Sequence, residues 1–273
     1  MIILQFTGGY TVYQRKERLR TLISMDRRRA FGGWLWAAGA LYALLFIINV
    51  SSELLEDWGS AMVLFEYSRN MGHTLWLTPM MAALPFSMSF CADWKSRYYI
   101  CGVMRAGKRR YVFSKLCCCA LSGGAALAAG MAFFIALLYI RFNPSDDFMI
   151  EFMEYVNMQQ VLEHGAYAQY FAGIVYLQVI AGAFWALSAL AFSAWYPNAL
   201  FTLCFPLFLY RLALEISDLS GAPAWTSLPL LADGMVAMDY WPTLAVATAV
   251  FAGLSVICCL VFRLGVYRRL NNG

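Results

Sequence analysis

The segment 102–109, Gly-Val-Met-Arg-Ala-Gly-Lys-Arg, has the spacing of a nucleotide phosphate-binding loop as far as its lysine. In such a loop, backbone N–H groups and the lysine bind the phosphates, and a Ser or Thr directly after the lysine holds Mg²⁺. Arg109 occupies that position and cannot bind a cation. The rest of the chain contains no segment typical of a nucleotide-binding domain. We therefore predict that this chain binds no nucleotide.

Histidine and cysteine are the other residues that could support catalysis or bind a metal. His73 and His164 are the only histidines, and neither stands in a His-Glu-x-x-His pattern. Cys117, Cys118 and Cys119 are consecutive, but adjacent residues of a helix point about 100° apart, so these thiols cannot close a tetrahedral zinc site. The sequence also lacks a Gly-x-Ser-x-Gly elbow. We expect no catalytic site and no metal site.

The composition indicates that the chain lies in a membrane. Its 273 residues are 62% hydrophobic and 13% charged, and the mean hydropathy is +0.60. Soluble domains have about 45–50% apolar and about 25% charged residues, so this amount of apolar surface requires the bilayer. The net charge of +4 is explained by membrane topology. We therefore predict no nucleic-acid partner.

Six long apolar segments are expected to cross the bilayer as helices, because backbone polar groups in lipid must be satisfied within the segment. A span needs about 20 apolar residues at a rise of about 1.5 Å each. The predicted fold is an all-α integral membrane protein with six transmembrane helices. A basic, amphipathic segment 1–29 precedes them, and a short basic tail 263–273 follows. The predicted spans are 30–50, 71–92, 116–140, 170–195, 199–216 and 243–262.

The positive charges indicate which side of the membrane each connection faces. Of the 20 Lys and Arg residues, all but Arg69, Arg141 and Arg211 fall in connections on one side. Positive charge is retained on the cytoplasmic side. We predict that both termini are cytoplasmic and that the membrane is a bacterial plasma membrane. The cytoplasmic cations are then Arg15, Lys16, Arg18, Arg20, Arg27, Arg28, Arg29, Lys95, Arg97, Arg105, Lys108, Arg109, Arg110, Lys115, Arg263, Arg268 and Arg269.

Two outer connections are longer than a turn requires. Residues 141–169 contain Asn-Pro-Ser-Asp-Asp at 143–147, a pattern typical of a helix start, and predict a short outer helix. Residues 217–242 contain three prolines between apolar residues, and we expect this segment to fold back at the outer face.

Small residues at every fourth position predict close packing between helices. They occur in the third and sixth spans and support a compact bundle. The residues are Ala120, Gly124 and Ala128, and then Ala245, Ala249 and Gly253.

Arg211 lies 12 residues into the fifth span, roughly 18 Å into a layer about 30 Å thick. Glu215 follows four residues later on the same helical face. Two interpretations stay open: the arginine reaches the outer interface, or the pair lines a translocation path or a dimer seam. Gln178, inside the fourth span, is either a hydrogen-bonding contact between helices or a further residue of that path.

The connection 93–115 contains seven basic residues and one acid, with aromatic and aliphatic residues between them. Ionic pairing alone would not require these apolar residues. The pattern predicts a short helix along the membrane, with its basic side toward the cytosol. Such a helix is either a topology anchor attracted to anionic lipids or a docking element for a cytoplasmic partner.

Several features of this chain resemble the membrane subunit of an ABC-2 type transporter. An Asp follows the second span, a basic and aromatic helix comes next, and 105–111, Arg-Ala-Gly-Lys-Arg-Arg-Tyr, leads to Ser114-Lys115 at the third span. In that family this loop is the coupling helix that seats in a groove of the ATPase subunit. The resemblance implies that the ATPase contact is made or supported by Asp93, Lys95, Arg97, Arg105, Arg109, Tyr111 and Lys115.

The resemblance implies the permease subunit of an ATP-driven exporter for an unidentified substrate. ATP and Mg²⁺ would bind to separate ATPase subunits, and this chain would have no cofactor and no enzymatic activity of its own. Its partners would be ABC ATPase subunits, a second permease copy or a homologous permease, and membrane lipids. The long connection 141–169 departs from the family pattern. The alternative is a non-transporting membrane scaffold or an immunity protein against a membrane-active peptide.

Overall fold

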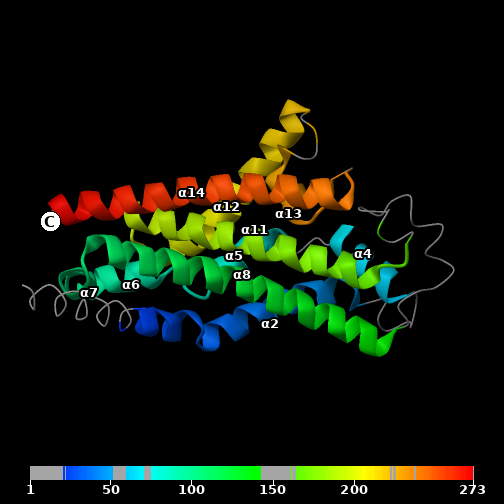
Figure 1. Cartoon of the computed structure of the whole chain (residues 1–273), viewed down its shortest axis with the longest axis horizontal. Coiled ribbons are helices and arrows are strands. Elements are labelled where there is room, and N and C mark those ends of the chain that lie inside the picture. Colours follow the sequence, from blue (N-terminus) through cyan, green and yellow to red (C-terminus); the bar gives the residue numbers. More distant parts are fainter. Residues whose placement is uncertain are drawn as a thin grey trace, which may run out of the picture.

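A computed structural model describes residues 21, 23–51, 60–70, 75–142, 161, 164–221, 223, 226–236 and 238–272. The described chain is helical and contains no strand. Five of its helices are long and apolar enough to cross a membrane, and the longest of them lie side by side along one axis (Figure 1). Helix length and composition therefore support the prediction of an all-α, multi-pass membrane protein. The five are Ile23–Asn49, Lys108–Arg141, Tyr167–Trp195, Ala199–Ser220 and Tyr240–Asn271.

Long helices alternate with short ones along the chain. Residues 23–30 form a helical segment that leads through a turn at 31–32 into α2. The elements are then α2 (Gly33–Asn49), α4 (Ala61–Asn70), η1 (Leu75–Leu77), α5 (Thr78–Ala83), α6 (Ser89–Lys95), α7 (Tyr98–Ala106), α8 (Lys108–Arg141), α11 (Tyr167–Trp195), α12 (Ala199–Ser220), α13 (Leu228–Ala232) and α14 (Tyr240–Asn272).

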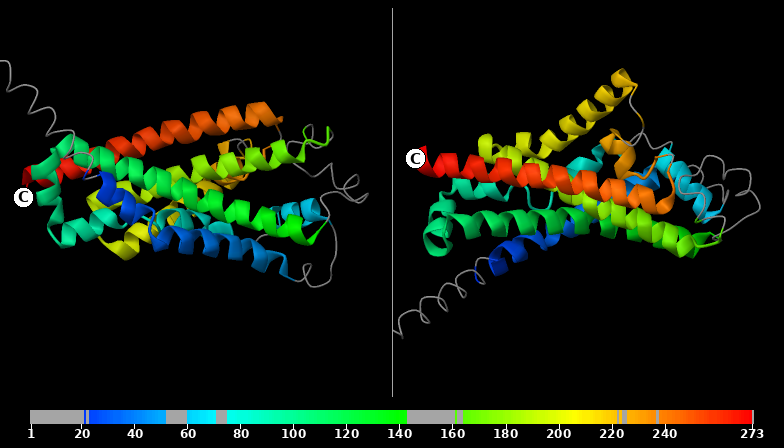
Figure 2. Two further views of the ribbon diagram at one scale, coloured as in Figure 1. Left: turned by 60° about the horizontal axis from the view of Figure 1, so that its bottom comes forward. Right: turned by 45° about the horizontal axis from the view of Figure 1, so that its top comes forward.

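Helix α11 is the central helix of the bundle. It packs against both α8 and α14, and α8 also packs against α2 (Figure 2). Backbones approach closely at glycines: a Cβ at Gly123 of α8 would lie 2.7 Å from the Gly182 carbonyl oxygen of α11, and one at Gly130 would lie 2.5 Å from the Gly39 oxygen of α2. Small residues therefore set the spacing of these three helices. A Cβ at Gly253 of α14 would meet nothing within 4 Å, so the close approach predicted there is not made within one chain.

The second predicted span, 71–92, is not one continuous helix. Residues 71–74 lie outside the described chain, and the remainder is divided into η1, α5 and the first part of α6, with turns between α5 and α6. Pro85 explains this break, because its nitrogen carries no hydrogen and its ring clashes with the carbonyl four residues earlier. The prediction of an unbroken helix is therefore wrong. The segment nevertheless runs along the bundle from α4 at one end to α7 at the other (Figure 1).

The second half of α12 points away from the other helices (Figure 2). Pro206 lies inside this helix, and a proline in a helix interior removes a hydrogen bond and favours a bend. Only Thr202 and Pro206 of α12 are buried, so its apolar surface is largely open in the single chain. The short helix α13 that follows packs into the core through Leu231 and Ala232. The chain therefore folds back onto the bundle after α12, and its position at the outer face of a membrane stays a prediction.

The described chain enters and leaves the bundle at the same end. Residues 23–30 and the C-terminal part of α14 lie at the left of Figure 1, near α6 and α7. Both α8 and α14 extend at this end beyond the spans predicted for them, because each helix continues into the adjoining basic residues. The tail predicted at 263–273 is thus helical as far as residue 272. Most of the predicted segment 1–29 and the start of the helix predicted in 141–169 lie outside the described residues.

Candidate functional site

Helix α7 is separated from its neighbours by two sharp corners. Arg97, between α6 and α7, has a φ of 57°, and Gly107, between α7 and α8, has a φ of 85°. Both values lie in the left-handed region, which glycine adopts readily and other residues seldom do. A short helix within 93–115 is therefore confirmed, and it lies at the end of the bundle that carries the C-terminus (Figure 1).

A buried ionic cluster joins α6 and α8, the helices on either side of α7. The Lys115 Nζ of α8 is 2.9 Å from Asp26 Oδ1 and 2.8 Å from Asp93 Oδ2, and the lysine side chain is 1% exposed. Asp26 belongs to the helical segment before α2, and Asp93 belongs to α6. One lysine therefore joins three segments of the chain. Buried charges of this kind are tolerated only when they are paired and hydrogen-bonded.

Further hydrogen bonds complete this cluster. The Tyr111 hydroxyl donates to Asp93 Oδ2 at 3.0 Å, and the Ser114 hydroxyl donates to Asp26 Oδ2 at 2.6 Å. Arg29, which is about half exposed, donates to Asp93 Oδ1 at 3.0 Å. We refer to Asp26, Arg29, Asp93, Tyr111, Ser114 and Lys115 as the lysine cluster.

The seven residues predicted to make or support the ATPase contact divide into two groups. Asp93, Tyr111 and Lys115 are buried in the lysine cluster, where they hold α6 and α8 together. They cannot touch another protein in this conformation. The other four are exposed and surround α7; they are Lys95, Arg97, Arg105 and Arg109.

An aromatic contact connects α7 to the end of α14. Trp94 stacks on Tyr99, with ring centroids 4.7 Å apart, and the guanidinium of Arg269 lies 4.6 Å from the centroid of the Trp94 ring. Arg269 Nε also donates to the Ala194 carbonyl oxygen at 2.6 Å, near the C-terminus of α11. A cation at this position satisfies carbonyl groups that have no partner within the helix. The loop is therefore attached to α11 and α14 as well as to α8.

A second buried charge cluster lies at the opposite end of the bundle. Glu66 and Arg69 of α4 form an ion pair of 2.6 Å, and both side chains are 3% exposed or less. The Tyr170 hydroxyl of α11 donates to Glu66 and accepts from Arg69 Nη1 at 3.0 Å. Sequence reasoning placed Tyr170 at the start of the fourth span, and it missed the cluster because it placed Glu66 and Arg69 in an outer connection. Their spacing of three residues on one short helix was the available signal.

One edge of the Arg69 guanidinium remains unpaired. Its Nε and Nη2 have no hydrogen-bond partner within the described part of the chain, although both are buried. The N–H groups of Nε and Nη2 point out along the same edge of the planar guanidinium, so one acceptor group could bind both of them. The site could therefore hold a further acceptor, such as an ordered water or a carboxylate.

Gln178 is committed to contacts within the protein. Its Oε1 accepts from the Tyr42 hydroxyl at 2.9 Å, and its Nε2 donates to Asp233 Oδ1 at 3.1 Å and to the Ala232 carbonyl oxygen at 3.3 Å. The amide thus connects α11 to α2 and to the end of α13. Of the two interpretations from sequence, this geometry favours a contact between helices. Burial raises the pKa of the Asp233 carboxyl, while the charge of Arg69 and the Gln178 hydrogen bond oppose that shift.

Arg211 and Glu215 lie on the open part of α12. Both side chains are exposed, and neither forms an ion pair with a described residue. They are surrounded by exposed apolar side chains, including Leu212 and Ile216. Gln178, by contrast, is buried in the core.

Metal ligation and known relatives offer no further guide to the site. Within the described ranges, no three His, Cys, Asp or Glu side chains come together in a way that could hold a metal ion. In comparisons with protein-family models, curated proteins and solved structures, none matches this chain.

Proposed function

We propose that this chain is the permease subunit of an ATP-driven ABC-2 type exporter, working with separate ATPase subunits that bind ATP and Mg²⁺. One observation carries the proposal: a short helix flanked by exposed cations lies at the end of the bundle, and a buried ionic cluster joins α6 and α8, the helices on either side of it. This combination suits an element that receives force from a partner. A topology anchor alone would not need the buried attachment.

The exposed cations around α7 would make the contact with the ATPase. Lys95, Arg97 and Arg105 face solvent, and Met104 beside them is 73% exposed. A large apolar side chain among arginines is typical of protein–protein interfaces. We assign docking to this surface, which we call the α7 surface.

The lysine cluster would transmit movement from the α7 surface to the membrane helices. A displacement of α6 moves Asp93, and Lys115 then pulls on α8 and on the helical segment that contains Asp26. Because the charges are buried, separating them is expensive, and the segments are expected to move as one unit. Movement of α8 would in turn shift α11, against which it packs.

The membrane topology forms part of the same proposal. We assign the broken segment η1–α6 as a sixth crossing, because it returns the chain from α4 to the end that carries α7 (Figure 1). The end that holds α7 and the C-terminus faces the cytoplasm of a bacterial cell, in keeping with its excess of Lys and Arg. The open face of α12, with Arg211 and Glu215, would meet a second permease or line the path between two permeases.

The test is association with an ATPase. The chain carrying an affinity tag is expressed with the ATPase encoded nearest to it, and the complex is purified in mild detergent. We expect the two proteins to co-purify and the double variant R97E/R105E to lose the association. The matched control is R27E/R28E, which reverses two exposed charges at the same end but outside the α7 surface.

Two results would count against the proposal. Equal loss in both double variants would show that only the general charge of this end matters. Undiminished ATPase binding by R97E/R105E would remove the docking role of α7. If no ATPase associates with the wild-type chain, the alternative of a non-transporting scaffold or immunity protein becomes preferable.

A further inference from the structure

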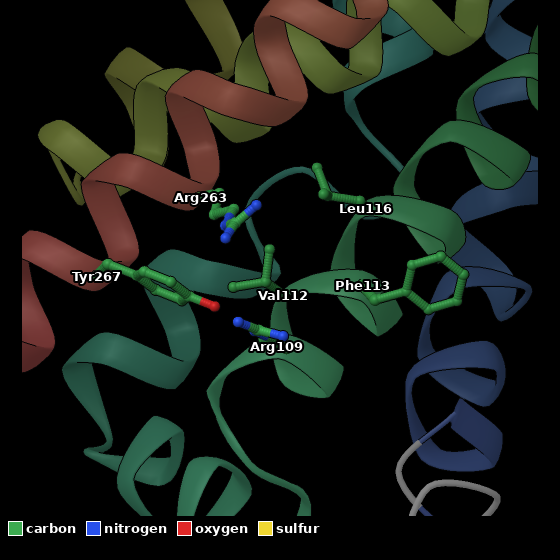
Figure 3. Close-up of a pocket in the computed structure, with 6 residues that line it drawn as sticks. All are labelled: Arg109, Val112, Phe113, Leu116, Arg263 and Tyr267. Carbon is green, nitrogen blue, oxygen red and sulfur yellow. The ribbon is translucent and has the colours of Figure 1, made fainter.

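A pocket of about 360 Å³ opens between the N-terminal end of α8 and the C-terminal part of α14 (Figure 3). In Figure 3, the side chains of Arg109, Arg263 and Tyr267 lie around the opening, and the Tyr267 hydroxyl points toward Arg109. Apolar side chains form the rest of the wall. The lining residues are Arg109, Val112, Phe113, Leu116, Arg263 and Tyr267.

The pocket has a strong positive charge that the protein does not neutralise. None of its lining residues is acidic, and neither Arg109 nor Arg263 forms an ion pair with any described residue. The Arg263 guanidinium lies over the Tyr267 ring, 5.4 Å from its centroid. An adjoining pocket contributes Arg105 and Lys108. A concave site with this charge attracts an anion.

The position of the pocket along the helices corresponds to the edge of the hydrocarbon layer. Arg263 directly follows Phe262, the last residue of the apolar stretch predicted at 243–262. Arg109 lies about two helical turns, or roughly 10 Å, before Leu116, where the apolar stretch of α8 begins. Arginines at such a level reach toward the headgroup region of a bilayer.

Exposed apolar side chains lie on both helices at the pocket. Phe113 at its wall is 59% exposed, and Leu260, about one turn before Arg263 on α14, is 51% exposed. These side chains lie on helices that are long and apolar enough to cross a membrane. A ligand that carries an anionic group and long apolar chains would satisfy both parts of this surface. An inorganic anion would satisfy only the first.

We propose that this pocket binds the phosphate of an anionic phospholipid. Arg109 and Arg263 bind the phosphate oxygens, Tyr267 donates a further hydrogen bond, and an acyl chain lies over Phe113 and Leu116. A headgroup with its own ammonium is disfavoured, because the adjoining pocket already holds Arg105 and Lys108. Phosphatidylglycerol therefore binds more tightly than phosphatidylcholine. The site does not depend on the proposed ATPase.

The experiment measures lipid binding to the purified, delipidated chain in the absence of any other protein. Phosphatidylglycerol or phosphatidylcholine is titrated into the detergent solution, and bound lipid is counted by native mass spectrometry. We expect saturable binding of phosphatidylglycerol and at least about tenfold weaker binding in R109Q/R263Q, since each charge-assisted hydrogen bond to phosphate is worth about tenfold. Y267F, which changes no charge, should weaken binding severalfold.

The matched control is R27Q/R28Q, which removes two exposed positive charges from the same end of the bundle without altering the pocket. Its affinity for phosphatidylglycerol should equal that of the wild type. Equal binding of both lipids, or an equal loss in the control, would overturn the proposal in favour of general electrostatic attraction. A third titration uses inorganic phosphate in the absence of lipid. If inorganic phosphate binds as tightly as phosphatidylglycerol, the pocket is a phosphate-ion site, and this result would also overturn the proposal.

Discussion

Replacing Lys115 by methionine tests whether one buried charge holds the α7 end of the bundle together. Lys115 pairs with Asp26 at 2.9 Å and with Asp93 at 2.8 Å, and all three side chains are 5% exposed or less. Methionine has a similar length and removes the charge alone. Asp93 keeps Arg29 as a partner, but Asp26 keeps only the Ser114 hydroxyl within the lysine cluster.

The loss of stability expected in K115M follows from the charges of the cluster. Asp26, Arg29, Asp93 and Lys115 together carry no net charge, and K115M leaves the cluster with one uncompensated negative charge. Removing one partner of a buried ion pair costs about 3–5 kcal/mol. The double variant D26N/K115M restores neutrality, since Asp93 then pairs with Arg29. We expect it to recover most of the lost stability. The single variant D26N completes the double-mutant cycle, which gives the coupling energy of the pair.

The assay is thermal unfolding in detergent with a thiol-reactive dye. Cys91, Cys118 and Cys119 are buried and become reactive when the bundle opens, after the exposed thiols have been blocked. The control is Lys95→Met, which removes an exposed lysine from the same end. Its unfolding temperature should stay close to that of the wild type, because exposed charges contribute about 1 kcal/mol or less.

Two outcomes would refute this reasoning. If K115M unfolds at the wild-type temperature, Lys115 is not buried between two ionised carboxylates. If D26N/K115M is less stable than K115M, the unpaired charge of Asp26 is not what destabilises K115M. Either result would also weaken the proposed route from α6 to α8.

Three further predictions concern other parts of the chain. G123A should lower the free energy of unfolding by about 1–3 kcal/mol, because the new Cβ would lie 2.7 Å from the Gly182 carbonyl oxygen. G253A should be neutral or stabilising, because a Cβ there meets nothing within 4 Å. Equal unfolding temperatures for the two variants would contradict the close contact between α8 and α11. Burial raises the pKa of Asp233 in the folded state. Asp233 therefore contributes most to the free energy of unfolding below its ordinary pKa, and this contribution is lost as the pH rises through the raised, folded-state pKa. D233N should therefore flatten the pH dependence of unfolding measured by tryptophan fluorescence, and a steeper dependence would reverse the assignment. If the proposed function is correct, R211L should reduce ATP-dependent export at unchanged membrane abundance, and full activity would indicate that Arg211 only reaches the interface.

Sequence reasoning succeeded where a property depends on runs of neighbouring residues. The long helices 108–141, 167–195 and 240–272 contain the spans predicted from apolar length, because a helix in lipid must satisfy its backbone locally. The short helix α7 followed from basic and apolar residues interleaved over one loop. The break at Pro85 could also have been predicted, since proline interrupts a helix wherever it occurs in the interior.

The candidate site was only partly predictable. Asp93, Tyr111 and Lys115 were identified as members of the loop, but nothing in the sequence indicated that they turn inward, bind one another and, through Lys115, reach Asp26. Asp26 lies 88 positions from Ser114 and 89 from Lys115 along the chain. The relevant signal was weak: Asp26 and Asp93 are among the few acidic residues in connections otherwise rich in Lys and Arg.

The sequence by itself determined that this chain belongs in a membrane, where its long helices begin and end to within a few turns, and that positive charge gathers at one end. These properties arise from local composition, which sets the transfer free energy of each segment. Only the tertiary structure decided which charges are buried and paired, which glycines touch a neighbouring backbone, and which arginines surround a pocket. Such contacts depend on how helices pack across the bundle, and residues distant in sequence enter them together.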